Sequence, residues 1–258
     1  MIDGCMVEAG QIEHFHRLGF FLLANPFGVE QMQALDKRQR QVEFEWVARD
    51  FPEGFNRGAC QFLMMGEALL RLVERPDVVD MARHLLDCDE VHVGACGLGD
   101  AGKIVSAGKP RHQVHWHADG EPDSKQVSLR TALDRHGPDN GPLRVLPGSQ
   151  LRPRAEITEE MRQLELATGH HDEEPEQYFA AHPHEVALHL DPRWTLVWTP
   201  SAWHATGVKT AAGPRRAMAW NYFPAGGLRR DVAAMKHIYA EQWRDWSVER
   251  RRLWGLVD

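Results

Sequence analysis

The sequence predicts an α+β, β-rich fold in which helices at both ends of the chain flank a central antiparallel β unit. Three observations support this prediction. Residues 1–90 carry apolar side chains at helical spacing, residues 91–224 form short apolar runs separated by Gly, Pro, Asn and Asp, and residues 228–254 return to helical spacing. A chain of 258 residues, 43 % of them hydrophobic, can bury one sizeable core, so we expect a single domain covering 1–258.

The helical lead-in before residue 91 contains several predicted elements. They are a helix at 12–18, a strand at 20–23, a helix from Val29, an apolar helical stretch at 62–72, and a helix from Pro76 to Leu86. Gly19 is a typical stop for the first helix, and Pro76 suits the first turn of the last one.

The β core is predicted to hold seven strands, followed by one closing helix. The predicted strands are 91–96, 113–119, 127–133, 143–146, 186–190, 195–199 and 217–223. A polar, acidic insertion at 155–180 interrupts them, and we expect its segment 158–178 to be a loop with a short helix that serves as a lid. One continuous helix is expected at 228–254.

Composition excludes several classes of function. A formal net charge of −7 gives no general basis for binding nucleic acid phosphates. The four cysteines are too far apart for a zinc ribbon or a disulfide scaffold, so we expect reduced thiols. The start of the chain lacks a signal-peptide pattern, and no stretch approaches the roughly 18 apolar residues of a membrane span. We therefore expect a cytoplasmic protein without a membrane partner.

One His-x-Asp motif stands out by its context. Fifteen histidines and 37 acidic residues should give about two His-x-Asp/Glu motifs by chance, and the chain has four. His117 and Asp119 close the alternating segment 113–119, and residues i and i+2 of a strand share one face. The motifs at 170–173 lie in a polar loop, and the one at 189–191 runs into a proline. His117 and Asp119 are therefore candidate metal ligands.

A third ligand is available directly after the apolar strand 195–199, at His204. Two histidines and one carboxylate form the facial ligand set of non-haem Fe(II) oxygenases, which leaves three positions for a 2-oxo acid and O2. 2-Oxoglutarate also needs its distant carboxylate held by an arginine. Arg215 and Arg216 point to opposite sides of a strand, so one of them can face the cavity, and Thr206 adds a hydroxyl.

Four sequence blocks occur together in a fixed order. They are Trp116-His117-Ala-Asp119, Asn140-Gly-Pro-Leu143 with Leu146-Pro-Gly-Ser149, Trp203-His204-Ala-Thr206, and Pro214-Arg215-Arg216. In order and spacing, these blocks resemble the phytanoyl-CoA dioxygenase family of Fe(II)/2-oxoglutarate oxygenases.

The resemblance implies a double-stranded β-helix, or jelly-roll, core at 91–224 with flanking N-terminal and C-terminal helices. It also implies catalytic Fe(II) ligation by His117, Asp119 and His204, and binding of 2-oxoglutarate by Arg215 with help from Thr206. Family members of this kind use O2 to hydroxylate a C–H bond of a small-molecule substrate, with succinate and CO2 as products. Members that halogenate lack the carboxylate ligand, so Asp119 favours hydroxylation or a related oxidation.

The substrate does not follow from the resemblance. The stretch that marks ectoine hydroxylases after the ligand aspartate is absent from residues 120–125, and Gln150 replaces the histidine that usually ends the Gly-Ser-His block. A natural product or a catabolic intermediate is the expected substrate class. Trp116, Trp203 and Thr131 are candidate substrate contacts, although core packing is an alternative role for the two indoles.

Rival interpretations use His115 as well. His115-x-His117-x-Asp119 also begins the di-zinc motif of metallo-β-lactamase-like hydrolases, but Gly120 stands where the next histidine should be. His115, His117 and Glu121 also fit the start of a cupin motif. A jelly-roll binding protein without catalysis is the remaining alternative.

Overall fold

The computed structural model describes residues 7–48, 51–100, 113–120, 124–169 and 177–257. The described helices are α1 (Ala9–Leu18), α2 (Val29–Ala48), α3 (Arg57–Met64), α4 (Glu67–Val73), α5 (Pro76–Leu86), α7 (Arg154–Leu166), α8 (Val232–Tyr239) and α9 (Val248–Leu253), with short 3-10 helices at Ser149–Leu151 and Ala240–Asp245. The strands are β1 (Phe20–Ala24), β2 (Val91–Asp100), β3 (Val127–Ala132), β4 (Leu143–Val145), β5 (Val186–Leu188), β6 (Trp194–Trp198), β7 (His204–Thr206) and β8 (Arg216–Pro224).

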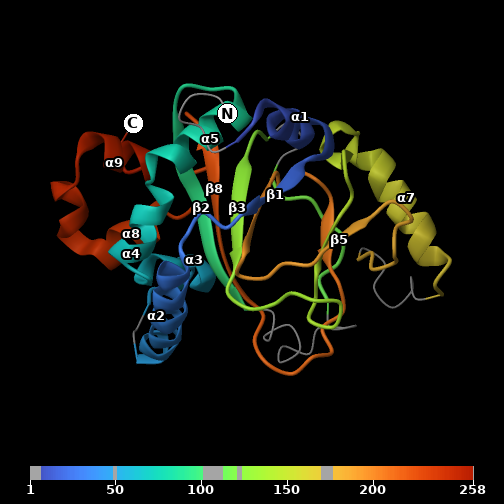
Figure 1. Ribbon diagram of the computed structural model, residues 1–258, viewed down its shortest axis with the longest axis horizontal. Helices are drawn as coiled ribbons and strands as arrows, with labels where there is room; N and C mark the ends of the chain where they lie inside the picture. The colour runs from blue at the N-terminus through green and yellow to red at the C-terminus, as the bar shows by residue number, and fades with distance from the viewer. Residues whose placement is uncertain (1–6, 49–50, 101–112, 121–123, 170–176, 258) are drawn as a thin grey trace.

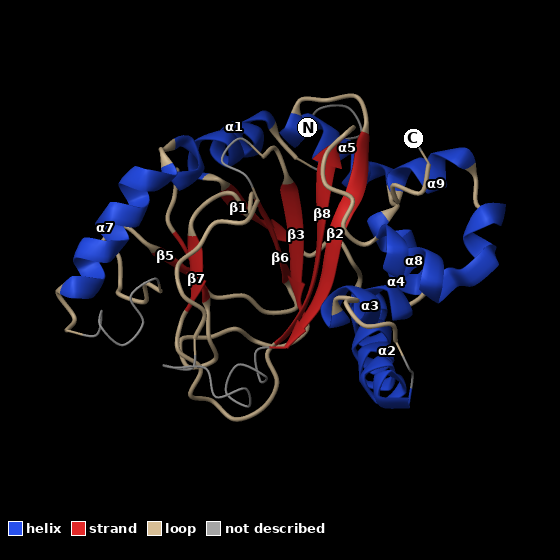
Figure 2. Cartoon of the chain, turned by 180° about the vertical axis from the view of Figure 1, so that it is seen from behind, coloured by secondary structure: helices blue, strands red, loops and turns tan. Residues whose placement is uncertain are grey.

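Two antiparallel sheets face each other (Figure 2). The larger sheet has the order β1-β6-β3-β8-β2 and the smaller one β5-β4-β7. Residues 113–119 run beside β7, because His117 and His204 exchange two backbone hydrogen bonds and the Thr206 N–H donates to the Val114 carbonyl. From β3 to β8 the chain therefore passes back and forth between the two sheets, with β4 and β5 as the one consecutive pair of described strands in the same sheet, which is the predicted jelly-roll arrangement.

Helices cover the outer faces of both sheets (Figure 1). The largest apolar cluster lies between the larger sheet and the helices before β2 and after β8, and it includes Phe62, Leu129, Trp220 and Tyr222. A second cluster, with Leu143, Leu196 and Trp198, fills part of the space between the sheets. A third joins α7 to the smaller sheet. The space between the sheets is thus bounded by strands on both sides.

Two predicted helical segments differ from the structure. The stretch 62–72 contains the end of α3 and most of α4, because Gly66 has φ +81° and separates them. The closing helix at 228–254 is α8, a 3-10 segment and α9, since the helix breaks at Ala240 with φ +43° and Ser247 caps a new one. None of the described helices has the length and hydropathy to cross a bilayer.

The β core and its insertion also differ in part. Residues 113–119 were predicted as a strand, but they form only an isolated bridge from His117 to His204 of β7. The strand β7 itself was not among the predicted strands. The insertion forms the 13-residue helix α7, which buries Ile157 and Met161 against the smaller sheet. This helix covers the first part of the expected lid, and residues 170–176 of that segment lie outside the described residues, so the lid stays a prediction.

Candidate metal centre

The structure brings His117, Asp119 and His204 together. Each offers one ligand atom, and the three atoms lie within 4.8 Å of one another. The Asp119 carboxylate is 3.9 Å from the Nε2 of His117 through one oxygen and 3.9 Å from that of His204 through the other. Backbone pairing of His117 with His204 and the i, i+2 relation of His117 to Asp119 produce this convergence.

Backbone hydrogen bonds orient both imidazoles. The Nδ1–H of His117 donates to the His115 carbonyl at 2.8 Å, and that of His204 donates to the Ala202 carbonyl at 3.0 Å. A carbonyl only accepts, so both protons lie on Nδ1 and both Nε2 lone pairs face Asp119. Burial, followed by the neighbouring His117, lowers the pKa of His204 well below its usual value. Two imidazole Nε2 atoms and one carboxylate on one side fit a divalent iron ion.

Asp119 is held through its backbone. Its N–H donates to the Pro200 carbonyl at 2.9 Å, and its own carbonyl accepts from the Gln126 side chain at 3.2 Å. Gln126 in turn accepts a hydrogen bond from Asn221 of β8 at 2.9 Å. The side chain of Asp119 remains 57 % exposed. The backbone of Asp119 is therefore held from the larger sheet and the loop after β6, while its carboxylate stays accessible to an incoming ion.

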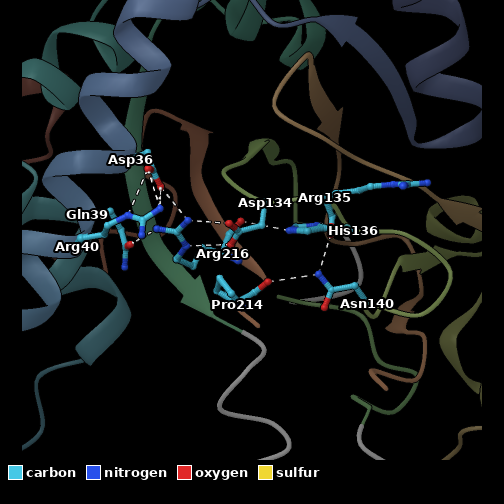
Figure 3. Close-up of polar contacts among 9 residues, drawn as sticks. All are labelled: Asp36, Gln39, Arg40, Asp134, Arg135, His136, Asn140, Pro214 and Arg216. Carbon is cyan, nitrogen blue, oxygen red and sulfur yellow. Dashed lines mark hydrogen bonds and ion pairs between the residues drawn. The ribbon is translucent and has the colours of Figure 1, made fainter. Parts of the chain in front are cut away.

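Arg215 and Arg216 point to opposite faces of the larger sheet, as predicted. Arg216 faces α2, where it forms ion pairs with Asp134 at 2.7 Å and Asp36 at 2.8 Å and donates to Gln39 at 2.6 Å (Figure 3). Arg215 is buried on the other face, and its Nε donates to the Gly141 carbonyl. Arg216 thus binds protein side chains on the α2 side of the sheet, and Arg215 is the arginine of the pair that points between the sheets.

Gly141 allows Arg215 to lie beside the end of β7. It has φ +61°, and a Cβ there would be 3.2 Å from Arg215 Nε and 3.3 Å from the Gly207 carbonyl oxygen. Thr206, next to Gly207, accepts a hydrogen bond from the Val114 N–H at 2.7 Å through its hydroxyl oxygen. Its hydroxyl proton remains available as a donor. Arg215 and Thr206 can therefore present donors at one end of the inter-sheet space.

The three predicted substrate contacts lie elsewhere. Trp116 and Trp203 each precede a ligand by one residue, so they point outward and pack with Ile157 and Met161 of α7. Thr131 is fully buried and bonds Thr195 at 2.9 Å on the face that Leu129 presents to the helices. None of the three faces the metal ligands, so this expectation is not supported.

The rival sites do not assemble in the described part of the chain. The His115 ring lies 5.4 Å from that of His117 and 6.2 Å from that of Phe179, and His115 does not belong to the group of ligand atoms around Asp119. Glu121 lies outside the described residues. Sequence reasoning did miss one charged residue between the sheets, Arg130 of β3, whose signal is an arginine in an otherwise apolar strand.

Comparisons with known proteins agree with this geometry. The family model described as "Phytanoyl-CoA dioxygenase (PhyH)" matches residues 15–217. Among curated proteins, ectoine dioxygenase of Sphingopyxis alaskensis is 26 % identical over 158 residues, covering 55 % of this chain and 50 % of the relative. That of Nocardia farcinica is 28 % identical over 153 residues, covering 55 % and 51 %. The chain spans about half the length of the curated relatives it matches.

Solved structures show the same fold. AviO1 from Streptomyces viridochromogenes is 20 % identical with a TM-score of 0.62, covering 86 % of this chain and 97 % of the other. HygX from Streptomyces hygroscopicus, solved with nickel and 2-oxoglutarate, is 14 % identical with a TM-score of 0.64, covering 86 % and 89 %. EctD from S. alaskensis with bound Fe is 21 % identical with a TM-score of 0.62, covering 89 % and 82 %. With most of its length matched by the family model, the chain belongs to the phytanoyl-CoA dioxygenase family.

Proposed function

We propose that the protein is an Fe(II)- and 2-oxoglutarate-dependent dioxygenase that hydroxylates, or otherwise oxidises, a C–H bond of a small molecule. The observation that carries this proposal is the convergence of His117, Asp119 and His204, whose ligand atoms lie within 4.8 Å of one another. Membership of the phytanoyl-CoA dioxygenase family supports it independently.

In this proposal the three side chains hold Fe(II) through two imidazole Nε2 atoms and one carboxylate oxygen. Because the three ligands bind the ion from one side, the coordination positions on its other side remain for the 2-oxo acid and O2. When bound, the iron and 2-oxoglutarate supply the oxidising chemistry, with succinate and CO2 as products. The protein contributes preset ligand directions, because the backbone carbonyls of residues 115 and 202 fix both imidazoles before any ion arrives.

Arg215 and Thr206 are proposed to bind the distant carboxylate of 2-oxoglutarate. A guanidinium matches a carboxylate with paired donors, and the Thr206 hydroxyl can add a third. Burial of Arg215 strengthens such a contact, since water competes weakly there. Both residues lie at the Gly141–Gly207 end of the inter-sheet space.

The proposed substrate is a small molecule of natural-product or catabolic metabolism. Relatives in this fold include enzymes named for ectoine and for nogalamycin biosynthesis, so the fold accepts different substrates. Residues 120–125 lack the stretch expected of ectoine hydroxylases, so ectoine is not the substrate we propose. Hydroxylation is the proposed reaction, because Asp119 supplies the carboxylate ligand.

The test is aerobic succinate formation from 2-oxoglutarate by anaerobically Fe(II)-loaded protein, with a substrate library that includes ectoine. We expect iron-dependent turnover that Asp119→Ala abolishes and that Arg215→Met shifts to much higher 2-oxoglutarate concentrations. Asp191→Ala is the matched control, because His189-Leu-Asp191 has the same spacing on an exposed turn bound to Arg193. Equal turnover in Asp119→Ala would refute the proposal, and tight zinc binding without 2-oxoglutarate consumption would favour a zinc or cupin-type site at His115 and His117.

A further inference from the structure

Arg130 places a guanidinium between the two sheets. Along β3, Leu129 belongs to the helix-side cluster and Ala132 to the inner cluster, so Arg130 shares the inward face with Ala132. Its cross-strand neighbours are Ala219 of β8 and Leu196 of β6, and Leu196 is also part of the inner cluster. The side chain therefore enters the same space as the candidate metal centre.

The charge of Arg130 has no counterion among the described residues. Its Nε is fully buried without a hydrogen-bond partner, and no described carboxylate pairs with the guanidinium. Burial lowers the pKa of Arg130 to about 10, so the group stays protonated at neutral pH. By contrast, Arg144 pairs with Glu185 at 2.6 Å and Arg216 with Asp134 at 2.7 Å. An uncompensated inward cation is unfavourable, and an anionic ligand would offset this cost.

The position of Arg130 along β3 indicates which anion. At the start of the strand, Gln126 contacts the backbone of Asp119, the metal-side carboxylate. At the other end, Ala132 pairs with Ala217, two residues after Arg215. Arg130 lies two residues before that end, which corresponds to about 7 Å along the strand. Arg130 is therefore located between the metal ligands and Arg215.

A 2-oxo dicarboxylate that binds the metal at one end and Arg215 at the other would span the space between the metal ligands and Arg215, where Arg130 lies. An anionic substrate is the competing ligand, but it would enter from the accessible side of the centre, where the Asp119 carboxylate is 57 % exposed. The half-buried Arg130 lies nearer the Arg215 end of β3, two residues from Ala132 and four from Gln126 at the Asp119 end. The position thus favours the cosubstrate over the substrate as its partner.

We propose that Arg130 is a second cationic contact for 2-oxoglutarate, acting with Arg215 to fix the dianion and to select a dicarboxylic 2-oxo acid over a monocarboxylic one. This inference rests on the proposed function. Arg130 is a positioning residue for the cosubstrate, and its removal leaves the three metal ligands intact.

The experiment is an anaerobic calorimetric titration of 2-oxoglutarate into Fe(II)-loaded wild type, Arg130→Met, Arg130→Lys and Arg135→Met. Arg130→Met is expected to raise the Kd at least about tenfold, since hydrogen bonds to charged groups are worth more than 1 kcal/mol. Arg130→Lys should retain part of the affinity. The exposed Arg135 is the charge-matched control and should leave the Kd unchanged. The preference for 2-oxoglutarate over 2-oxobutyrate should narrow in Arg130→Met alone.

Thermal unfolding separates ligand binding from a structural role. Without ligand, Arg130→Met should melt at the same temperature as wild type or higher, because it removes an unpaired charge, while the Tm gain from 2-oxoglutarate should shrink. An unchanged Kd in Arg130→Met would overturn the inference, and a loss confined to substrate-coupled turnover would assign the guanidinium to a substrate anion. If Arg215→Met loses 2-oxoglutarate binding and Arg130→Met keeps it, the proposed function survives without this inference. Failure of metal-loaded wild type to bind 2-oxoglutarate would refute both.

Discussion

The adjacent residues Arg215 and Arg216 have different surroundings. We expect Arg216 to stabilise the fold and Arg215 to bind the cosubstrate. Arg216 pairs with two carboxylates at the contact between α2 and the larger sheet, Asp134 and Asp36, of which Asp36 also pairs with Arg40. Arg215 makes a described hydrogen bond to one backbone carbonyl and faces the inter-sheet space. Substitution of Arg216 should therefore mainly lower stability, and substitution of Arg215 should mainly weaken cosubstrate binding.

Arg216→Met should lower the free energy of unfolding by about 3 kcal/mol, because it leaves Asp134 without its bidentate partner in a largely buried site. Arg215→Met should cost less stability than Arg216→Met but abolish measurable 2-oxoglutarate binding. Urea unfolding and anaerobic 2-oxoglutarate titration of both variants measure the two effects. Equal losses of stability in the two variants would contradict this division of roles.

The alternation of side chains along extended segments explains which features of the candidate site could be predicted from the sequence. The i, i+2 spacing correctly predicted that His117 and Asp119 share a face, and alternation correctly predicted that Arg215 and Arg216 do not. Which arginine faces inward depends on contacts with α2, and Gln39 lies 177 residues before Arg216. By the same alternation, Trp116 and Trp203 point away from the metal ligands and pack against α7. Their closeness to the ligands in the sequence had suggested substrate contacts instead.

At the scale of elements, the start of α5 combines two helix signals. Pro76 occupies the first turn, and the Asp77 carboxylate accepts from Arg75 Nε at 3.0 Å, Arg75 Nη2 at 2.5 Å and the Val78 N–H at 3.0 Å. The hydrogen bond from Arg75 is the main reason why the pKa of Asp77 is lowered. An acidic group in this position is also favoured by the helix dipole.

Asp77→Asn should lower the free energy of unfolding by about 1 kcal/mol at pH 7. The folded-state pKa is below the unfolded one, so the carboxylate's contribution is complete above about pH 4 and is lost as the pH falls through the folded-state pKa. Wild type and variant should therefore converge in strongly acidic solution. Denaturant unfolding from pH 7 to pH 2 tests this. A difference in the free energy of unfolding between wild type and variant that stays constant over the whole range would argue against it.

Element boundaries were predictable where local signals were strong. Gly19 and Pro76 correctly marked the end of α1 and the start of α5. The three residues of β7 are too few for a period-2 pattern, and they are extended because residues 113–119 and β4 pair with them. The jelly-roll topology likewise came from the family resemblance, since the strand pattern alone allowed a sandwich or a barrel.

At the scale of the whole molecule, the C-terminal helices brace the scaffold on the side of the larger sheet away from the metal ligands (Figure 2). Arg250 of α9 donates to Glu74 at 2.6 Å and to Glu67 at 2.9 Å, and its guanidinium lies 3.8 Å from the centre of the Trp246 ring. The family match ends at residue 217, before these helices.

Arg250→Met should destabilise the protein by about 2 kcal/mol, because Glu74 is 10 % exposed and loses its nearer cation, keeping Arg71 at 3.6 Å and the Trp254 indole N–H at 2.9 Å. The affinity for 2-oxoglutarate below the unfolding transition should stay the same, since the sheet separates α9 from the site. Chemical unfolding and ligand titration of one preparation measure both quantities. A weakened affinity in the folded variant would show that the C-terminal helices reach the site.

The most direct test of the metal centre is an anaerobic titration of the metal-free protein with Fe(II), followed by 2-oxoglutarate, monitored by visible absorbance. Wild type should bind one Fe(II) per chain and develop a charge-transfer band when 2-oxoglutarate is added, and Asp119→Ala and His204→Ala should not. Persistence of the band in both ligand variants, or its absence from iron-loaded wild type, would contradict iron binding by His117, Asp119 and His204.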